Sequence, residues 1–313
     1  MNDTKLPYIS IIIIAYKREE FLLNAIKSVI NQTLDKKYYE IIVVKNFADN
    51  TIDTYIKNNH IIGIVSKEDS LFGKLIEALN IANGQIISFL EDDDLFSNNK
   101  LEIVYNKFKA NNNLCYYHNN HITVNEKYQK IDSNAGKSPA FNLSSISVRK
   151  SILNLNNIKS QWSLEHFRYL TDQFMYLLAL ESGQKIIARK EKLTYYMFHS
   201  SASHIDTNDI NTFIKFRSAN IEKDIKSFIT FDEIFVSRKA KKYIKQKITN
   251  IKIDGYILGK NKKPNNTLNI FKKSDRPFSI SLKIYLAYLL VRVHYNFRYI
   301  IIKKLLNNAK GHE

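Results

Sequence analysis

The chain has 313 residues, of which 44% are hydrophobic, and a formal net charge of +17 at pH 7. Its single cysteine, Cys115, excludes an intrachain disulfide framework and a zinc-thiolate site. The low counts of eight glycines and four prolines argue against repeats and long flexible linkers, and no run of about 18 apolar residues marks a membrane-spanning helix.

The first 90 residues alternate between runs typical of buried strands and segments with helical spacing. The predicted elements, in order, are the strand Tyr8–Ala15, the helix Phe21–Ile30, the strand Glu40–Val44, the helix Thr51–Asn59, the strand Ile61–Val65, the helix Leu71–Ala82 and the strand Ile86–Leu90. The pair Asn83-Gly84 predicts a left-handed cap on the last helix. Such alternation predicts an α/β fold, with a mostly parallel sheet flanked by helices.

The pattern changes after residue 95, where strands and helices no longer alternate one to one. The predicted elements here are the helix Asn98–Ala110, the strands Leu114–Val124 and Ser144–Arg149, the helix Thr171–Ser182 with Gly183 as its cap, and the strands Lys185–Ala188 and Thr194–Phe198. From about Asp206 onward the chain reads as mostly helical and basic.

Four consecutive carboxylates, Glu91–Asp94, follow the predicted strand Ile86–Leu90 directly. Because ligands of open α/β sheets bind at the carboxyl ends of the strands, we expect this run at the binding edge. Carboxylates so close together repel one another unless a cation shares them, and Mg²⁺ and Mn²⁺ prefer oxygen ligands. The alternative is a solvated acidic turn in which Asp94 and Ser97 cap the next helix.

Motifs in a fixed order resemble family 2 glycosyltransferases, which have a GT-A fold. The turn at 15–18 resembles the family's Thr-Tyr-Asn-Arg, the helix ends in Ser-Val-x-x-Gln-Thr at 28–33, and Glu-Ile-Ile-Val-Val stands at 40–44. Residues 82–94 resemble Ala-x-Gly-x-x-Ile-x-Phe-Leu-Asp-x-Asp-Asp, Thr171-Asp172 resembles Glu-Asp, and residues 196–203 resemble Tyr-Arg-x-His-x-x-x-Ser. The resemblance covers about residues 8–204 and implies an inverting, hexosyltransferase-type enzyme domain over residues 1–204.

The resemblance also implies roles for the matching residues. A nucleotide-diphosphate sugar donor would be bound by Ala15, Tyr16, Arg18, Lys45, Gly73, Lys74 and Asp92. Asp93 would hold Mn²⁺ or Mg²⁺ with Glu91 and His199, which would neutralise the charge on the leaving diphosphate. Asp172 would be the general base that takes the proton of the acceptor hydroxyl. The alternatives are a helix N-cap for Asp172 and an ordinary core or surface histidine for His199.

Three positions depart from the family pattern. Lys45-Asn46 stands where the family has an Asp-Asp pair that reads the nucleotide base. A lysine only donates hydrogen bonds, so it cannot accept the imide proton of uracil or thymine. The sequence therefore does not predict which nucleotide base the donor carries. Glu91 replaces the first Asp of the metal motif, and Thr171 replaces the Glu of Glu-Asp. These departures motivate a second hypothesis, a nucleotide-sugar binding protein without turnover.

The excess positive charge lies at the C-terminal end: residues 1–204 carry +3 and residues 205–313 carry +14. We expect 205–313 to form a basic, mostly helical region that contacts an anionic surface. Its basic run Lys239–Lys247 and aromatic-rich stretch Ile280–Leu306 suit an anionic membrane interface, while a solvated face or an oligomer contact are alternatives.

These features predict where the enzyme works. The polar start Met1–Lys5 lacks the layout of a signal peptide. The sequence therefore predicts a cytoplasmic enzyme, peripheral on the inner face of the cell membrane, that acts on a glycan or lipid-linked acceptor. A nucleic-acid binder is a third hypothesis, which the acidic centre of the main domain disfavours.

Overall fold

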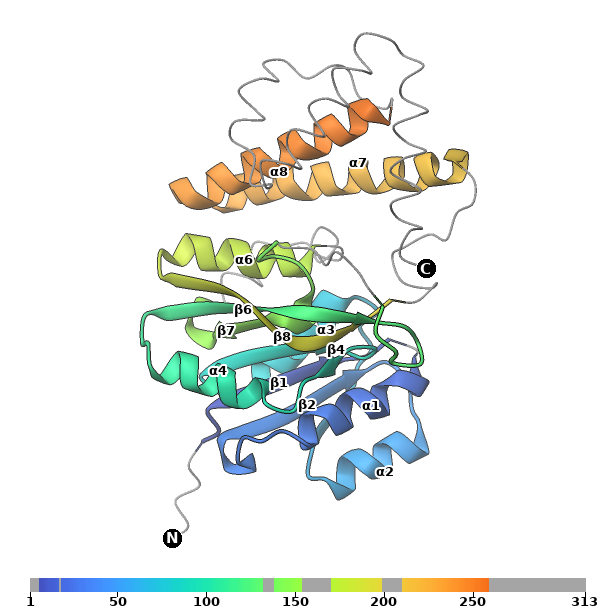
Figure 1. Ribbon diagram of the computed structural model, residues 1–313, viewed down its shortest axis with the longest axis vertical. Helices are drawn as coiled ribbons and strands as arrows, with labels where there is room; N and C mark the ends of the chain where they lie inside the picture. The colour runs from blue at the N-terminus through green and yellow to red at the C-terminus, as the bar shows by residue number, and fades with distance from the viewer. Residues whose placement is uncertain (1–5, 17, 132–137, 154–169, 199–209, 259–313) are drawn as a thin grey trace. The chain divides into compact units, whose positions relative to one another are not determined.

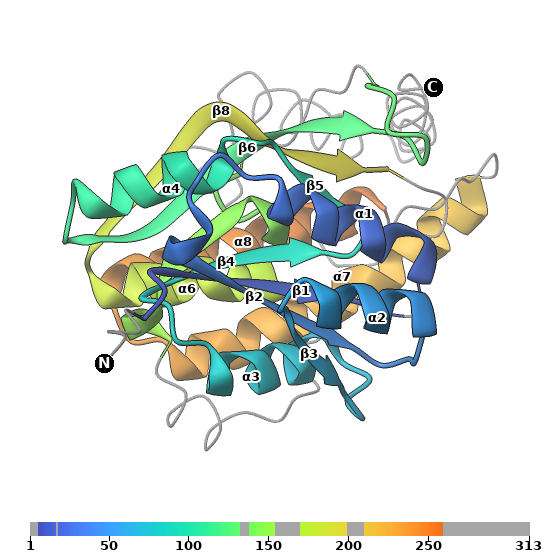
Figure 2. The same cartoon turned by 90° about the horizontal axis from the view of Figure 1, so that it is seen from below.

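The computed structural model describes residues 6–16, 18–131, 138–153, 170–198 and 210–258. The chain divides into two compact units, Met1–Phe198 and His199–Glu313. The boundary predicted at residue 204 lies outside the described residues. The first unit contains one eight-stranded sheet in the order β3-β2-β1-β4-β7-β6-β8-β5, with helices on both of its faces (Figures 1 and 2).

The parallel half of the sheet comes from the first 91 residues. Its elements are β1 (Ile9–Ile14), α1 (Glu19–Ile30), β2 (Tyr39–Lys45), α2 (Asn50–Asn58), β3 (Ile62–Val65), α3 (Leu71–Ile81) and β4 (Ile86–Glu91). Strands β2 and β3 lie on one side of β1, whereas β4 lies on the other. The strand order therefore reverses between β1 and β4, which is where an open α/β sheet leaves a crevice for a ligand.

The second half of the sheet is mixed. It consists of β5 (Leu95–Phe96), α4 (Lys100–Lys109), β6 (Leu114–Val124), β7 (Ile146–Arg149), α6 (Thr171–Ser182) and β8 (Lys185–Met197). Strand β7 runs antiparallel to both β4 and β6, while β8 runs parallel to β6 and antiparallel to β5.

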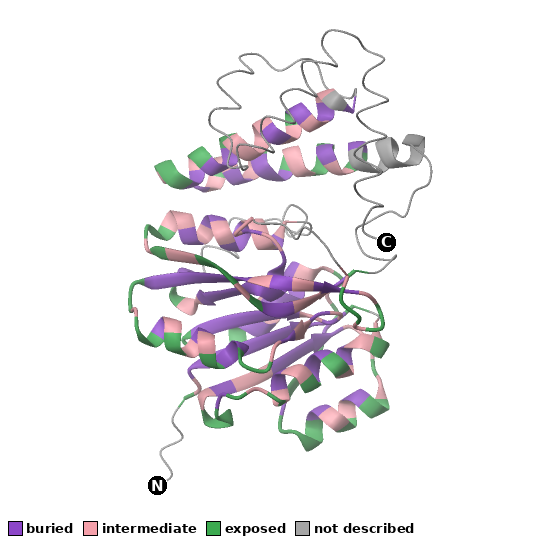
Figure 3. Cartoon of the chain, in the orientation of Figure 1, coloured by how far each residue is buried: buried purple, intermediate pink, exposed green. Residues whose placement is uncertain are grey.

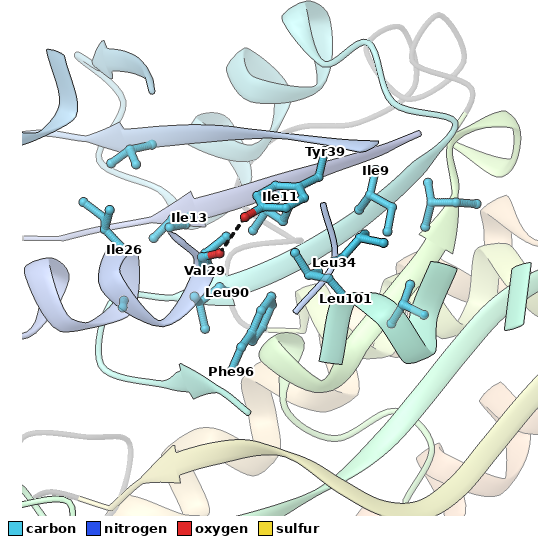
Figure 4. Close-up of a cluster of buried hydrophobic side chains, with 14 of the residues drawn as sticks. Ile9, Ile11, Ile13, Ile26, Val29, Leu34, Tyr39, Leu90, Phe96 and Leu101 are labelled. Carbon is cyan, nitrogen blue, oxygen red and sulfur yellow. Dashed lines mark hydrogen bonds between the residues drawn. The ribbon is translucent and has the colours of Figure 1, made fainter. Parts of the chain in front are cut away.

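The central strands β1, β2, β4, β6 and β7 are buried along most of their length, whereas β3 and much of β8 are exposed or half-buried. The helices expose their outer sides (Figure 3). On one face, Ile9, Ile11 and Ile13 pack in a cluster with side chains of α1 and α4, and the Tyr39 hydroxyl donates to the Val29 carbonyl at 3.2 Å (Figure 4). Helices α3 and α6 cover the other face, where their phenylalanines Phe72 and Phe174 meet edge to face with ring centroids 5.9 Å apart. Both faces of β1 are thus covered, as its near-continuous isoleucine run predicts.

A polar clasp joins β1, β2 and the turn before β4 near the amino ends of β1 and β4. The Ser10 hydroxyl donates to Glu40 Oε1 at 2.5 Å and accepts from the Gly84 amide at 2.7 Å. Glu40 Oε1 also accepts from the Asn83 amide at 2.6 Å. The predicted left-handed cap at Asn83-Gly84 is wrong, because helix α3 ends in an extended residue, Ala82 (φ −63°, ψ 127°).

Gly84 is required by close contact instead. A Cβ at this position would lie 2.4 Å from the Ser10 nitrogen and 2.6 Å from the Ile9 carbonyl carbon, both of which are backbone atoms. Gly183, by contrast, adopts the predicted left-handed conformation (φ 70°), and its Cβ would meet nothing within 4 Å.

The two glycines therefore form a matched pair for a stability test. We expect Gly84→Ala to lower the free energy of unfolding by about 2–4 kcal/mol, because β1 and the segment before β4 must separate. Gly183→Ala should cost only about 1 kcal/mol, from the left-handed backbone alone. Urea unfolding of both variants measures the difference, and equal losses would show that the clash at Gly84 is relieved by a small shift.

Another prediction about the sheet is wrong. The segments Lys185–Ala188 and Thr194–Phe198 belong to one continuous strand, β8, whose charged middle crosses an irregular register against β6. The short strand β5 was not predicted, because its two residues pair only with the distant Thr194 and Tyr195.

The second unit contains the helices α7 (Ile210–Ile234) and α8 (Arg238–Ile257), which pack on each other. The rings of buried Phe228, Phe231 and Phe235, in α7 and just after it, meet one another edge to face. Exposed cations repeat along one face of α8 at helical spacing, namely Arg238, Lys242, Lys245 and Lys252. None of the helices in the described part of the chain is both long and apolar enough to cross a membrane. The predicted stretch Ile280–Leu306 lies outside the described residues.

Candidate active site

The residues predicted to act together converge at the crevice between β1 and β4. Ile14, the last residue of β1, lies opposite Glu91, the last residue of β4. The turn after β1 and the acidic run after β4 therefore leave the sheet side by side, at its carboxyl edge.

Arg18 links these two segments. Its guanidinium Nη2 lies 2.6 Å from Asp92 Oδ1, and its Nη1 lies 2.5 Å from Asp93 Oδ2. The Tyr16 amide donates to the second oxygen of Asp92, Oδ2, at 3.0 Å. Burial alone would lower the pKa of Arg18, but the carboxylates of Asp92 and Asp93 outweigh it and raise that pKa.

The acidic run carries more negative charge than Arg18 offsets. Burial, followed by the charges of Asp93, Asp94, Asp92 and Asp172, raises the pKa of Glu91 well above its usual range. Burial also raises the pKa of Asp92 to about 6, against the opposing effect of Arg18. Burial is the largest cause of both shifts, and the neighbouring carboxylates add to it. The oxygen-only donor set here fits Mg²⁺ or Mn²⁺.

Residues that the sequence did not single out hold the acidic turn in place. The Ser144 hydroxyl accepts from the Glu91 amide at 3.0 Å, and Asp94 Oδ1 accepts from the Met197 amide at 2.8 Å. The Lys100 ammonium, fully buried, donates to the Ser144 carbonyl and to the Thr194 hydroxyl, the latter at 3.1 Å. Asp94 thus anchors the turn to β8 and does not cap the next helix.

A pocket of about 270 Å³ opens beside this turn. Its walls are Ile14, Tyr16, Arg18, Asp69, Leu71, Lys74 and Glu91. The buried Lys74 ammonium lies 4.6 Å from the centre of the Tyr16 ring. Helix α3 begins here, since Ser70 caps it by accepting from the Gly73 amide at 2.9 Å. Arg18, Lys74 and a helix N-terminus in the lining suit an anionic ligand. Asp69 and Leu71 were not predicted as pocket residues.

Asp172 lies in the first turn of α6, and its charge acts on both Glu91 and Tyr196. Its Oδ1 accepts from the neighbouring Gln173 amide at 2.7 Å. The alternative prediction of an N-cap is wrong, because the cap position is occupied by Leu170. The carboxylate of Asp172 therefore acts on the acidic turn from a different element, and its role as a base stays a prediction.

Three of the predicted binding residues contact other parts of the protein. The Lys45 ammonium is buried, 2.8 Å from Asp53 Oδ1, and donates to the Phe47 carbonyl at 2.5 Å. Ala15 is buried, with its amide bonded to the Val44 carbonyl at 2.9 Å. A Cβ at Gly73 would lie 2.5 Å from a carboxylate oxygen of Glu68. Their binding roles stay predictions.

Only some of the predicted metal ligands lie within the described residues. His199 lies outside the described residues. Among the residues that the structure describes, no three His, Cys, Asp or Glu side chains converge as a metal cage. Mg²⁺ is commonly held by one or two carboxylates together with substrate phosphates, so Asp92 and Asp93 fit this mode of binding.

An aromatic cluster that the sequence did not reveal lies beside these carboxylates. The rings of His121, Phe141 and Tyr196 lie with centroids 5.3–5.6 Å apart. Gln173 Nε2 donates to the Ala140 carbonyl at 2.5 Å and so ties this cluster to the start of α6. Burial lowers the pKa of His121 to about 4, so its imidazole is neutral at pH 7.

Comparison with known proteins agrees with the motifs. The model of the family described as Glycosyl transferase family 2 matches residues 10–170. An uncharacterized glycosyltransferase of Rickettsia conorii is 34% identical over 137 residues, which are 42% of this chain and 22% of that protein. One of Rickettsia felis is 31% identical over the same shares. The chain spans about a fifth of the length of the curated relatives it matches.

Solved structures share the fold. The crystal structure of S. aureus TarS 1-349 aligns with a TM-score of 0.55 and 15% identity, over 85% of this chain and 79% of that one. Its complex with UDP-GlcNAc aligns over the same shares with a TM-score of 0.55 and 16% identity. At this identity the likeness concerns the fold alone, and the GT-A-like architecture predicted from the sequence is confirmed.

Proposed function

Because the chain belongs to glycosyl transferase family 2, we propose that it transfers a sugar from a nucleotide-diphosphate sugar to a hydroxyl of a glycan acceptor, with inversion. One observation carries the proposal. The pocket at the β1–β4 crevice has Arg18 and Lys74 among its walls and the acidic turn at its edge. The UDP-GlcNAc complex of S. aureus TarS supports a UDP-sugar donor, although Lys45 leaves the base open.

In the proposed reaction the acceptor oxygen attacks the anomeric carbon of the donor. The bond from that carbon to the diphosphate oxygen breaks, and the acceptor proton passes to Asp172. Arg18 and Lys74 bind the diphosphate, and Tyr16 lies between Lys74 and the acidic turn. When bound, Mn²⁺ or Mg²⁺ would supply positive charge to the departing diphosphate, with Asp92, Asp93 and Glu91 as the side chains able to hold it.

A thermal-shift panel tests the donor. Wild-type protein is heated with UDP, GDP, CDP or dTDP, each with Mn²⁺, with Mg²⁺ or with EDTA. A ligand that binds only the native state at 100 times its Kd adds about 2.7 kcal/mol of stability. We expect one diphosphate to raise the Tm with metal and less with EDTA. Binding without release of diphosphate from the matching sugar donor would favour the binding protein without turnover.

We also propose that the enzyme is peripheral on the cytoplasmic face of a membrane and that its acceptor is lipid-linked. The exposed cations of α8 support this, because a basic residue near anionic lipid contributes about 1 kcal/mol. Lys242→Glu/Lys245→Glu should weaken binding of the full chain to anionic vesicles about 30-fold or more in cosedimentation.

A matched control changes the same charge elsewhere. Lys57→Glu/Lys67→Glu alters two exposed lysines of the first unit and should leave vesicle binding nearly unchanged. If both double variants sediment alike, or if wild-type protein fails to sediment at low salt, the cations of α8 do not form a membrane contact. An oligomer contact would then be the better reading.

A further inference from the structure

Arg18 holds the position that a divalent cation would need. Its guanidinium bridges Asp92 Oδ1 and Asp93 Oδ2, one nitrogen to each oxygen, at 2.6 and 2.5 Å. The other oxygen of Asp92 accepts the Tyr16 amide and is fixed by the backbone. The oxygen of Asp92 that accepts no backbone amide is therefore the one that Arg18 binds.

A guanidinium and a divalent ion cannot share these two oxygens. Both are cations, and at hydrogen-bond distance from the same carboxylates they would repel each other strongly in this partly buried place. Metal binding thus requires Arg18 to leave at least one of the two aspartates.

The Arg18 side chain has room to move away from the two aspartates. It lies in the short segment between β1 and α1, its side chain is 29% exposed, and it lines the pocket together with Lys74. A guanidinium that swings away from the aspartates stays on the wall of the pocket. There it meets the ligand for which its planar fork is suited, the oxygens of a diphosphate.

We propose that Arg18 is an exchangeable internal cation: it neutralises Asp92 and Asp93 in the empty site, gives way to the metal ion, and moves to the diphosphate of the donor. The proposal rests on the metal-dependent function proposed above. It has two consequences. Metal alone binds poorly, because it competes with Arg18, and metal binds well with the nucleotide, because the diphosphate takes up the displaced arginine.

The test is the affinity for Mn²⁺ alone, measured by titration of free Mn²⁺ with electron paramagnetic resonance. A pH of 8.5 keeps protons from competing for the aspartates. Removing Arg18 should strengthen this binding, although most changes in a binding site weaken it. We expect Arg18→Gln to bind Mn²⁺ about tenfold or more tightly than wild type, because hydrogen bonds between charged groups no longer have to be broken. With Mn²⁺ present, the same variant should bind the nucleoside diphosphate more weakly.

Two further variants complete the design. Lys67→Gln removes the same charge from an exposed position outside the pocket and should leave the Mn²⁺ affinity unchanged. Arg18→Lys keeps the charge but not the bidentate fork, so its Mn²⁺ affinity should lie between those of wild type and Arg18→Gln, and it serves as the test if Arg18→Gln does not fold.

The outcomes distinguish failure of the proposed cation exchange from failure of the proposed function. An Arg18→Gln affinity for Mn²⁺ equal to or weaker than that of wild type, or no Mn²⁺ binding by either, would overturn the exchange. Failure of the proposed function is seen in wild type instead, as the absence of any nucleoside diphosphate binding with either metal.

Discussion

Asp172→Asn should lower the rate of sugar transfer by about 10²–10⁴-fold, the range that general base catalysis contributes. Asparagine keeps the size of the side chain and can still accept from the Gln173 amide, but it cannot take the acceptor proton. The affinity for the donor should be nearly unchanged, because Asp172 comes from α6 and does not line the donor pocket. Kinetics with the donor that gives turnover, and calorimetric titration of its nucleoside diphosphate, measure the two effects separately.

A control for Asp172→Asn lies on the same helix. Glu181→Gln removes the same charge from the last turn of α6, and its transfer rate should match that of wild type. An equal loss of donor affinity in Asp172→Asn would mean that this carboxylate holds substrate or structure. The product should show inverted anomeric configuration by NMR, and retention would exclude a single displacement with Asp172 as its base.

Asp93→Ala should reduce metal-dependent binding of the nucleoside diphosphate by about 10²-fold or more, which corresponds to about 3 kcal/mol. The variant loses a proposed metal ligand and also one end of the Arg18 bridge, whereas Asp92 keeps its bonds to Tyr16 and Arg18. The fold should persist, because the acidic turn stays anchored through Ser144 and Met197.

Two comparisons make the Asp93 result specific. Binding in EDTA should change far less than binding in Mn²⁺, since only the metal-dependent part involves Asp93. Asp35→Ala, at an exposed position paired with Lys37, should leave both unchanged. Unchanged metal dependence in Asp93→Ala would place the metal elsewhere.

The sequence predicted the parallel half of the sheet almost residue for residue, for a physical reason. Strands buried on both faces are apolar throughout, and the helices between them keep one apolar face, so both patterns are strong and local. The predictions failed where the structure depends on distant partners. Strand β5 exists only through its pairing with β8, and Gly84 is needed because Ser10 approaches it closely.

The same difference separates the residues of the candidate site that could be predicted from those that could not. The acidic run, Arg18 and Asp172 could be named because they stand in motifs. Lys100 could not, because a lysine at the start of a helix normally reads as a surface residue, and only the packed structure shows that its ammonium is buried against Ser144 and Thr194. Lys45 was expected to face the nucleotide, but its pairing with Asp53 of the next helix could not be predicted from either residue alone.

The polar clasp at Ser10 fixes the alignment of β1 against its neighbouring strands, which the other residues of β1 do not. A run of isoleucines can slide by two residues against its neighbours and present the same side chains to the same faces, so apolar packing leaves several alignments nearly equal in energy. Ser10 is the one polar residue in β1, and its hydroxyl finds Glu40 and Gly84 in a single alignment. That alignment also places Ile14 opposite Glu91, and with it Arg18 within reach of Asp92 and Asp93. One serine near the amino end of the strand thereby fixes the alignment on which the geometry of the carboxyl edge depends.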